Sequence, residues 1–89
     1  MATLQIQSAE IAAPTTTGAA VDVSRATQVR VVNSGGTAYL LTIVTAGSGD
    51  VLGSTTIAAN ETVMIRKGSA ECMFAANVAI KLSRAGVVG

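Results

Sequence analysis

The stretch that decides the fold runs from residue 27 to residue 82, beginning with TQVRVVN (27–33) and ending with VAIKL (78–82). Apolar residues alternate within it at a period of two, the pattern of β-strands that bury one face. The alternating sets are Val29/Val31, Tyr39/Leu41/Ile43, Val63/Ile65 and Val78/Ile80/Leu82. Breaks rich in glycine or asparagine recur at the spacing of about 8–12 residues that is typical of sandwiches. The pattern predicts an all-β fold, a small antiparallel β-sandwich of jelly-roll-like form.

We expect about eight short strands and no helix, because no segment has a convincing 3.6-residue apolar period. The Ala58–Glu61 segment predicts a tight turn in which Asn60 tolerates positive φ. We expect Ala85–Gly89 to be frayed. The predicted strands are Leu4–Gln7, Val21–Val23, Thr27–Asn33, Ala38–Thr45, Val51–Ile57, Glu61–Lys67, Glu71–Ala75 and Val78–Arg84.

Residues 1–18 differ from the rest and predict an extended N-terminal arm, followed by a single sandwich domain over residues 19–89. Pro14 has no N–H to donate to a sheet and holds the preceding residue extended. Three threonines and a glycine follow it. Two outcomes fit: the arm closes an edge of its own sheet, or it crosses onto a neighbouring subunit.

The composition predicts an assembly. A single cysteine allows no internal disulfide, and the 89 residues include no histidine and two aromatic residues. A core this thin is marginal alone, so oligomerisation is the remaining common support. Only 12% of the residues are charged and the net charge is +1, which favours association. It does not suggest a clustered basic face for nucleic acid.

The start of the chain predicts neither export nor membrane anchoring. Residues 1–10 have no basic region followed by an apolar core, so we expect no secretory signal. No apolar run approaches the roughly 18 residues of a membrane span. A single reduced Cys72 is compatible with synthesis in a cytosol.

The segment Ala38–Thr45 is apolar on both predicted faces, with Leu40 and Val44 opposite the core-facing set. A strand of this kind needs a cover on its second face, either the arm or another subunit. Met64 and Leu52 are also out of phase with their core faces, which suggests an apolar outer patch. The candidate interface residues are Leu4, Ile6, Ile11, Pro14, Leu40, Val44, Met64 and Arg66.

Little in the sequence suggests catalysis. General acid–base chemistry normally uses histidine or converging carboxylates, and the five acidic residues are scattered singly. Cys72 lies in a predicted strand and is interpreted as a small buried apolar side chain. Lys67 and Glu71 flank a turn, where an exposed pair would help to set register. We expect no enzyme activity, no cofactor and no metal.

A family resemblance rests on the order of motifs in residues 27–82. These are Val-x-Val-Val-Asn-x-Gly, an apolar strand at Leu40–Val44, GSTTIAANETV (53–63) with Ile65 and Lys67 after it, and Glu71-x-x-x-Ala75. The pattern resembles small β-sandwich virion proteins of tailed bacteriophages. It is a pattern of strands and turns that carries no binding residue across, and residues 1–26 lie outside it.

The resemblance implies a structural role in a phage particle, most simply as a capsid decoration (cement) protein that bridges subunits. Its partners would be further copies of itself, the major capsid protein, or both, with neither nucleic acid nor membrane. The same features suit a small neck, tail or fibre component. A glycan-binding or host-surface module is the alternative from another class, although such sites usually present aromatic platforms.

Overall fold

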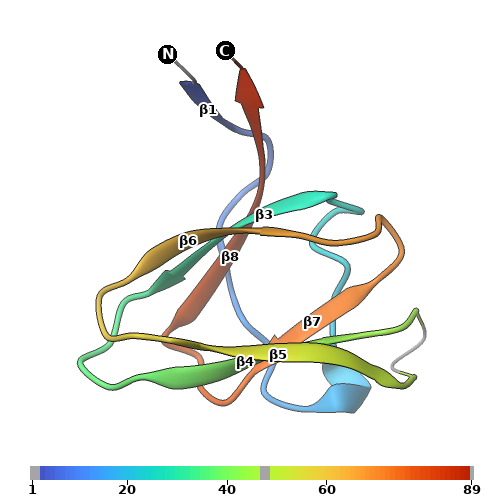
Figure 1. Ribbon diagram of the computed structural model, residues 1–89, viewed down its shortest axis with the longest axis vertical. Coiled ribbons are helices and arrows are strands. Elements are labelled where there is room, and N and C mark those ends of the chain that lie inside the picture. The colour runs from blue at the N-terminus through green and yellow to red at the C-terminus, as the bar shows by residue number, and fades with distance from the viewer. Residues whose placement is uncertain (1–2, 47–48, 89) are drawn as a thin grey trace.

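The computed structural model describes residues 3–46 and 49–88, and the side-chain surroundings of residues 5–46 and 49–86. Eight strands and one short 3₁₀ helix form two antiparallel sheets that pack face to face (Figure 1). The elements are β1 (Thr3–Ile6), β2 (Ile11–Ala12), η1 (Thr17–Ala19), β3 (Gln28–Asn33), β4 (Tyr39–Val44), β5 (Val51–Ile57), β6 (Thr62–Arg66), β7 (Cys72–Ala75) and β8 (Ile80–Val88).

The first sheet has the order β1-β8-β3-β6. β1 pairs with the C-terminal end of β8, and β2 pairs with Lys81 and Leu82 near the start of β8. The second sheet has the order β5-β4-β7, and an isolated bridge from Val21 to Met73 extends it beyond β7. The first and last strands of the chain are therefore neighbours, while β4 to β8 change sheets at every step except the β4–β5 hairpin. This winding is that of a jelly roll. The predicted all-β, jelly-roll-like sandwich is confirmed.

The core lies between the sheets and is aliphatic. Val29 and Val31 of β3 meet Leu41 of β4 and Met73 of β7, and all four are at most 1% exposed. Their positions follow from the period of two, because alternate residues of a strand share one face. Tyr39 packs against this cluster from its margin.

Residues 11–14 close one side of the sandwich. The Ala13 N–H donates to the Ile80 carbonyl at 2.8 Å in the first sheet, and the Pro14 carbonyl accepts from the Ala75 N–H at 2.9 Å in the second. Ala13 is 2% exposed and belongs to the core. Part of the segment predicted as an arm thus ties the two sheets of its own chain together.

The remainder of that segment forms a projecting ribbon. β1 runs antiparallel to the end of β8, with Leu4 opposite Val87 and Ile6 opposite Ala85. Figure 1 shows this ribbon, which carries both termini, standing out from the two-layered body. Fraying was predicted beyond residue 84. β8 instead continues to Val88, because β1 supplies the hydrogen-bonding partner there.

The predicted strand Val21–Val23 is wrong beyond Val21. Val23, Ser24 and Arg25 have φ values of 54°, 57° and 57°, which is a left-handed turn. The Ala26 N–H closes this turn onto the carbonyls of Asp22 and Val23, both at 3.2 Å. Left-handed backbone costs about 1–2 kcal/mol for each non-glycine residue, so tertiary contacts must hold it. The turn carries the chain from the edge of the second sheet to β3.

Candidate interaction surface

Five of the predicted interface residues are exposed, but they lie on separate surfaces. Ile6 is on the projecting ribbon, Ile11 on the edge strand β2, and Met64 and Arg66 on the outer face of β6, opposite Arg30 and Gln28 of β3. Leu40 is on the outer face of the second sheet and is 46% exposed. The single apolar patch predicted to combine Leu40, Val44, Leu52 and Met64 is therefore wrong, because Leu40 and Met64 lie on opposite outer faces of the sandwich.

The prediction that Val44 is an interface residue is wrong. Val44 was predicted on an outer face available to a partner, and it is 0% exposed. β4 is the central strand of its sheet, so Val44 has neighbours on both sides, Val51 of β5 and Cys72 of β7. The adjacent Thr42 is also buried, at 7% exposure. The apolar second face of this strand is thus largely covered by the chain itself.

Pro14 is half-buried and already engaged, since its carbonyl is bonded to β7. Its missing N–H costs nothing there, because it follows Ala13, the last residue to bond to β8. Leu4 lies in β1, but the surroundings of its side chain are outside the described residues.

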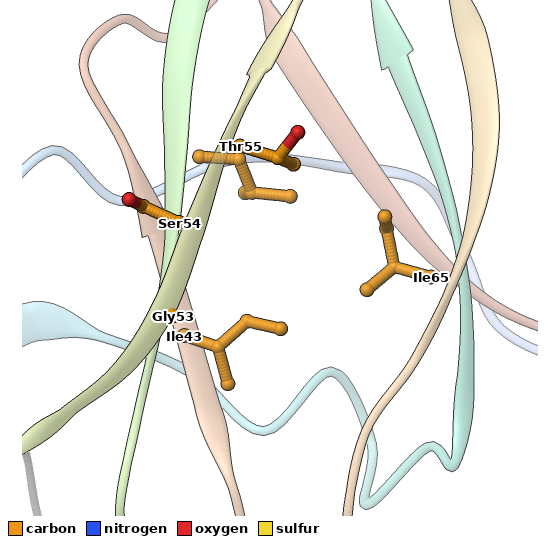
Figure 2. Close-up of a pocket in the computed structure, with 6 residues that line it drawn as sticks. Ile43, Gly53, Ser54, Thr55 and Ile65 are labelled. Carbon is orange, nitrogen blue, oxygen red and sulfur yellow. The ribbon is translucent and has the colours of Figure 1, made fainter.

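The side of the sandwich opposite residues 11–14 is open. β5 ends the second sheet and β6 ends the first, and within the part of the chain described neither has a hydrogen-bonded neighbour beyond it. Between them lies a pocket of about 180 Å³, which we call the β5 groove. Figure 2 shows Ile43 and Ile65 pointing toward one another from the two sheets, with Ser54 directed away. The groove is lined by Leu41, Ile43, Gly53, Ser54, Thr55 and Ile65.

The unpaired main-chain groups of β5 follow from the register of its neighbour. The Leu40 carbonyl accepts from the Ala76 N–H at 2.9 Å, so even-numbered residues of β4 bond toward β7 and odd-numbered ones toward β5. Thr55 is the partner of an odd-numbered residue, Leu41, and its groups are used within the sheet. The N–H and C=O groups of Ser54 and Thr56 consequently point to the open edge.

The edge of β5 has few of the features that prevent strand pairing. Residues 51–60 contain no charged residue and no proline, and residues 51–56 are all exposed. The strand has one bulge, which leaves Leu52 without a partner in β4 and restricts the regular edge to Gly53–Ile57. By contrast, Val21 and Pro14 bond to the outer edge of β7, and β6 carries Arg66. Charges and covering segments are the usual protection of an edge, and β5 lacks both.

Sequence reasoning missed this groove because it assigned Ile43 and Ile65 to the core. A signal was present in β5 itself. Apart from the buried Ile57 at its end, its inward positions are Gly53 and Thr55, whereas a fully enclosed strand would place large apolar residues there. A Cβ added at Gly53 would meet nothing within 4 Å.

Two buried polar side chains hold loops in place. Asn33 is 0% exposed, and its amide donates to the carbonyls of Thr37 and Ile57 at 2.7 and 3.0 Å while accepting from the Gly35 N–H at 2.9 Å. It fixes the β3–β4 loop against the end of β5. Both side-chain groups of this asparagine are therefore satisfied.

Lys67 is the second buried polar side chain that holds a loop in place. The expectation that it forms an exposed pair with Glu71 is wrong. Lys67 is 6% exposed, and its Nζ donates to the Ala26 carbonyl at 2.8 Å, holding the left-handed turn. Glu71 instead accepts from the Gly68 N–H at 2.7 Å. Burial lowers the pKa of Lys67 from 10.5, an effect that the nearby Asp22 carboxylate opposes.

Groups of three or more histidine, cysteine or carboxylate side chains able to hold a metal ion are not found among residues 3–46 and 49–88. Within the same described ranges, no helix has the length and apolar character needed to cross a bilayer. Cys72 is half-buried with a free thiol.

In comparison with known proteins, no family model, no curated protein and no solved structure matches the chain.

Proposed function

We propose that this chain is a structural protein of a phage particle, most simply a capsid decoration protein that bridges neighbouring subunits. The observation that carries the proposal is the distribution of exposed apolar side chains over separate surfaces. Ile6 is on the ribbon, Met64 on one sheet and Leu40 on the other, at 54%, 40% and 46% exposure. A protein that bridges neighbours needs more than one contact surface, and this arrangement supplies them.

The fold class supports the proposal in a general way. Jelly-roll sandwiches recur in viral capsid domains, and also in lectins and cupins, so the architecture by itself leaves the function open. A bridging role would act through buried area alone. A specific contact needs about 1,200–2,000 Å² in total, and many copies would sum their contacts over the particle.

The test uses the particle of the phage that encodes the chain. Each of Ile6→Lys, Leu40→Lys and Met64→Lys places a charge on one surface, and Thr16→Lys is the matched control at an exposed position off these surfaces. We expect at least two of the three variants to lower occupancy on purified heads tenfold or more, while the control binds fully. A triple variant that still decorates heads at full occupancy would refute the proposal. Occupancy confined to tails or necks would assign the chain to those parts instead.

A further inference from the structure

We propose that the open edge of β5 pairs antiparallel with β5 of a second copy, forming a two-fold dimer with one continuous six-stranded sheet. This inference names a partner for a surface that the proposed bridging role does not use. It rests on the β5 groove, the free main-chain groups of Ser54 and Thr56, and the absence of charged residues from the strand.

The geometry selects one register. When the two-fold axis passes beside Thr55, Ser54 of each copy lies opposite Thr56 of the other. These are the residues whose N–H and C=O groups face outward, so about four main-chain hydrogen bonds form across the axis. The bulge at Leu52 ends the regular edge on one side, and the turn that follows Ile57 ends it on the other.

The pairing would bury the apolar lining of the β5 groove. Residues opposite one another in an antiparallel pair point to the same face of the sheet, so Gly53 and Thr55 of the second copy would lie over the groove mouth. Ile43 and Ile65, which now line an open pocket, would be covered (Figure 2). Each copy does this for the other, as a two-fold interface requires.

Charge favours a second copy as the occupant. A strand with no charged residue pairs with itself without like charges meeting, and residues 51–60 contain none. The net charge of +1 adds little long-range repulsion between copies. A different protein as partner would more naturally be selected by a charged rim, which this edge lacks.

The first experiment measures the mass of the full chain by sedimentation between about 1 µM and 1 mM, a range that brackets the micromolar affinity expected of a small interface. Thr55→Lys places two ammonium groups side by side on the axis and should raise the dimer Kd at least tenfold. Thr62→Lys, at a threonine of β6 that is also exposed, is the matched control and should dimerise as the unmodified chain does. A monomer at every concentration, or a dimer that Thr55→Lys leaves unchanged, would overturn the inference.

The second experiment tests the register with a variant that adds no charge. In a Cys72→Ala background, Thr55→Cys places two thiols opposite each other at a non-hydrogen-bonded site, where Cβ atoms approach closely enough for a disulfide. Diamide should convert this variant to a covalent dimer at least tenfold faster than Thr62→Cys in the same background. Equal rates for the two variants would refute the pairing.

The outcomes separate this inference from the proposed function. A monomeric chain that decorates heads would end the β5 pairing and leave the bridging role standing. A β5-linked dimer that binds no part of a particle would do the reverse.

Discussion

At the scale of single residues, the fold depends on polar groups that reach buried carbonyls. Asn33 ends β3 in the interior and bonds to three main-chain groups of two separate segments. Lys67 ends at the carbonyl of Ala26 and holds a turn of three left-handed residues. Asn60 has a φ of 61°, as predicted for its turn, because asparagine tolerates that conformation better than most residues.

Replacing Asn33 should be among the most costly single changes. Asn33→Ala leaves the carbonyls of Thr37 and Ile57 and the Gly35 N–H without their partner. We expect a loss of about 2–4 kcal/mol in the free energy of unfolding, measured with urea. Asn77→Ala is the control, since the half-buried Asn77 accepts one such bond, from Ala79, and should cost about 1 kcal/mol. Equal losses in the two variants would contradict this account of Asn33.

Lys67 should give the stability a dependence on alkaline pH. Its pKa is lower in the folded chain than in the unfolded chain, so the unfolded chain binds more protons in the window just below 10.5. The free energy of unfolding attributable to Lys67 must therefore rise with pH across that window, as the buried charge is removed.

The measurement compares the unmodified chain with Lys67→Met from about pH 7 to 11, a range that spans the usual lysine pKa. The remaining ionisable groups are common to both proteins and largely cancel in the difference. The unmodified chain should gain stability relative to the variant as the pH increases. A difference that is constant with pH would show that the folded and unfolded pKa values are alike.

At the scale of elements, the N-terminal segment has two parts with different roles. β1 pairs with the projecting end of β8, whereas Ile11–Pro14 bond to both sheets and place Ala13 in the core. Ile11–Pro14 close one side of the sandwich in this way. The opposite side is open, because within the described residues no segment bonds to both β5 and β6.

Two deletions separate these parts. Removal of residues 1–9 takes away β1 and the hydrogen bonds of Gln7 and Ser8 to Arg84, and the body should keep a cooperative thermal transition with a modest loss of stability. Removal of residues 1–18 also takes away Ala13 and the Pro14 carbonyl, which should abolish cooperative unfolding or cost at least about 3 kcal/mol. Circular dichroism during heating distinguishes the two. Similar melting of both truncated chains would show that Ile11–Pro14 do not hold the sheets together.

At the scale of the whole molecule, the winding brings distant parts of the chain together. β1 pairs with β8, β3 pairs with β6 and β8, and β4 pairs with β7. Such pairings require long loops to close, and the entropy lost on closure precedes the stabilising contacts, which slows folding. Thr3 and Val88 are partners, so the first pairing spans nearly the whole chain.

Refolding from urea should accordingly take from about 10 ms to several seconds, in the range of all-β sandwiches. Stopped-flow measurement with Tyr39 as the fluorescent probe would follow it. The chain lacking residues 1–9 should refold at least as fast, because it omits the most distant pairing. Refolding within microseconds would contradict the dominance of long-range contacts.

The sequence alone determined most of the strands and most of the core-facing positions, because a period of two reports locally which face of a strand is buried. Val78 is an exception: it was predicted to face the core with Ile80 and Leu82, but it precedes β8 and is 55% exposed. Val51–Ile57 was predicted with its observed bounds, and β3, β4 and β6 to within a residue at each end. Only the tertiary structure decided which edges stay open, that Val44 and Lys67 are buried, and that Ala13 belongs to the core. Those properties depend on which strands become neighbours, and strand order comes from contacts between residues far apart in the chain, which no local pattern encodes.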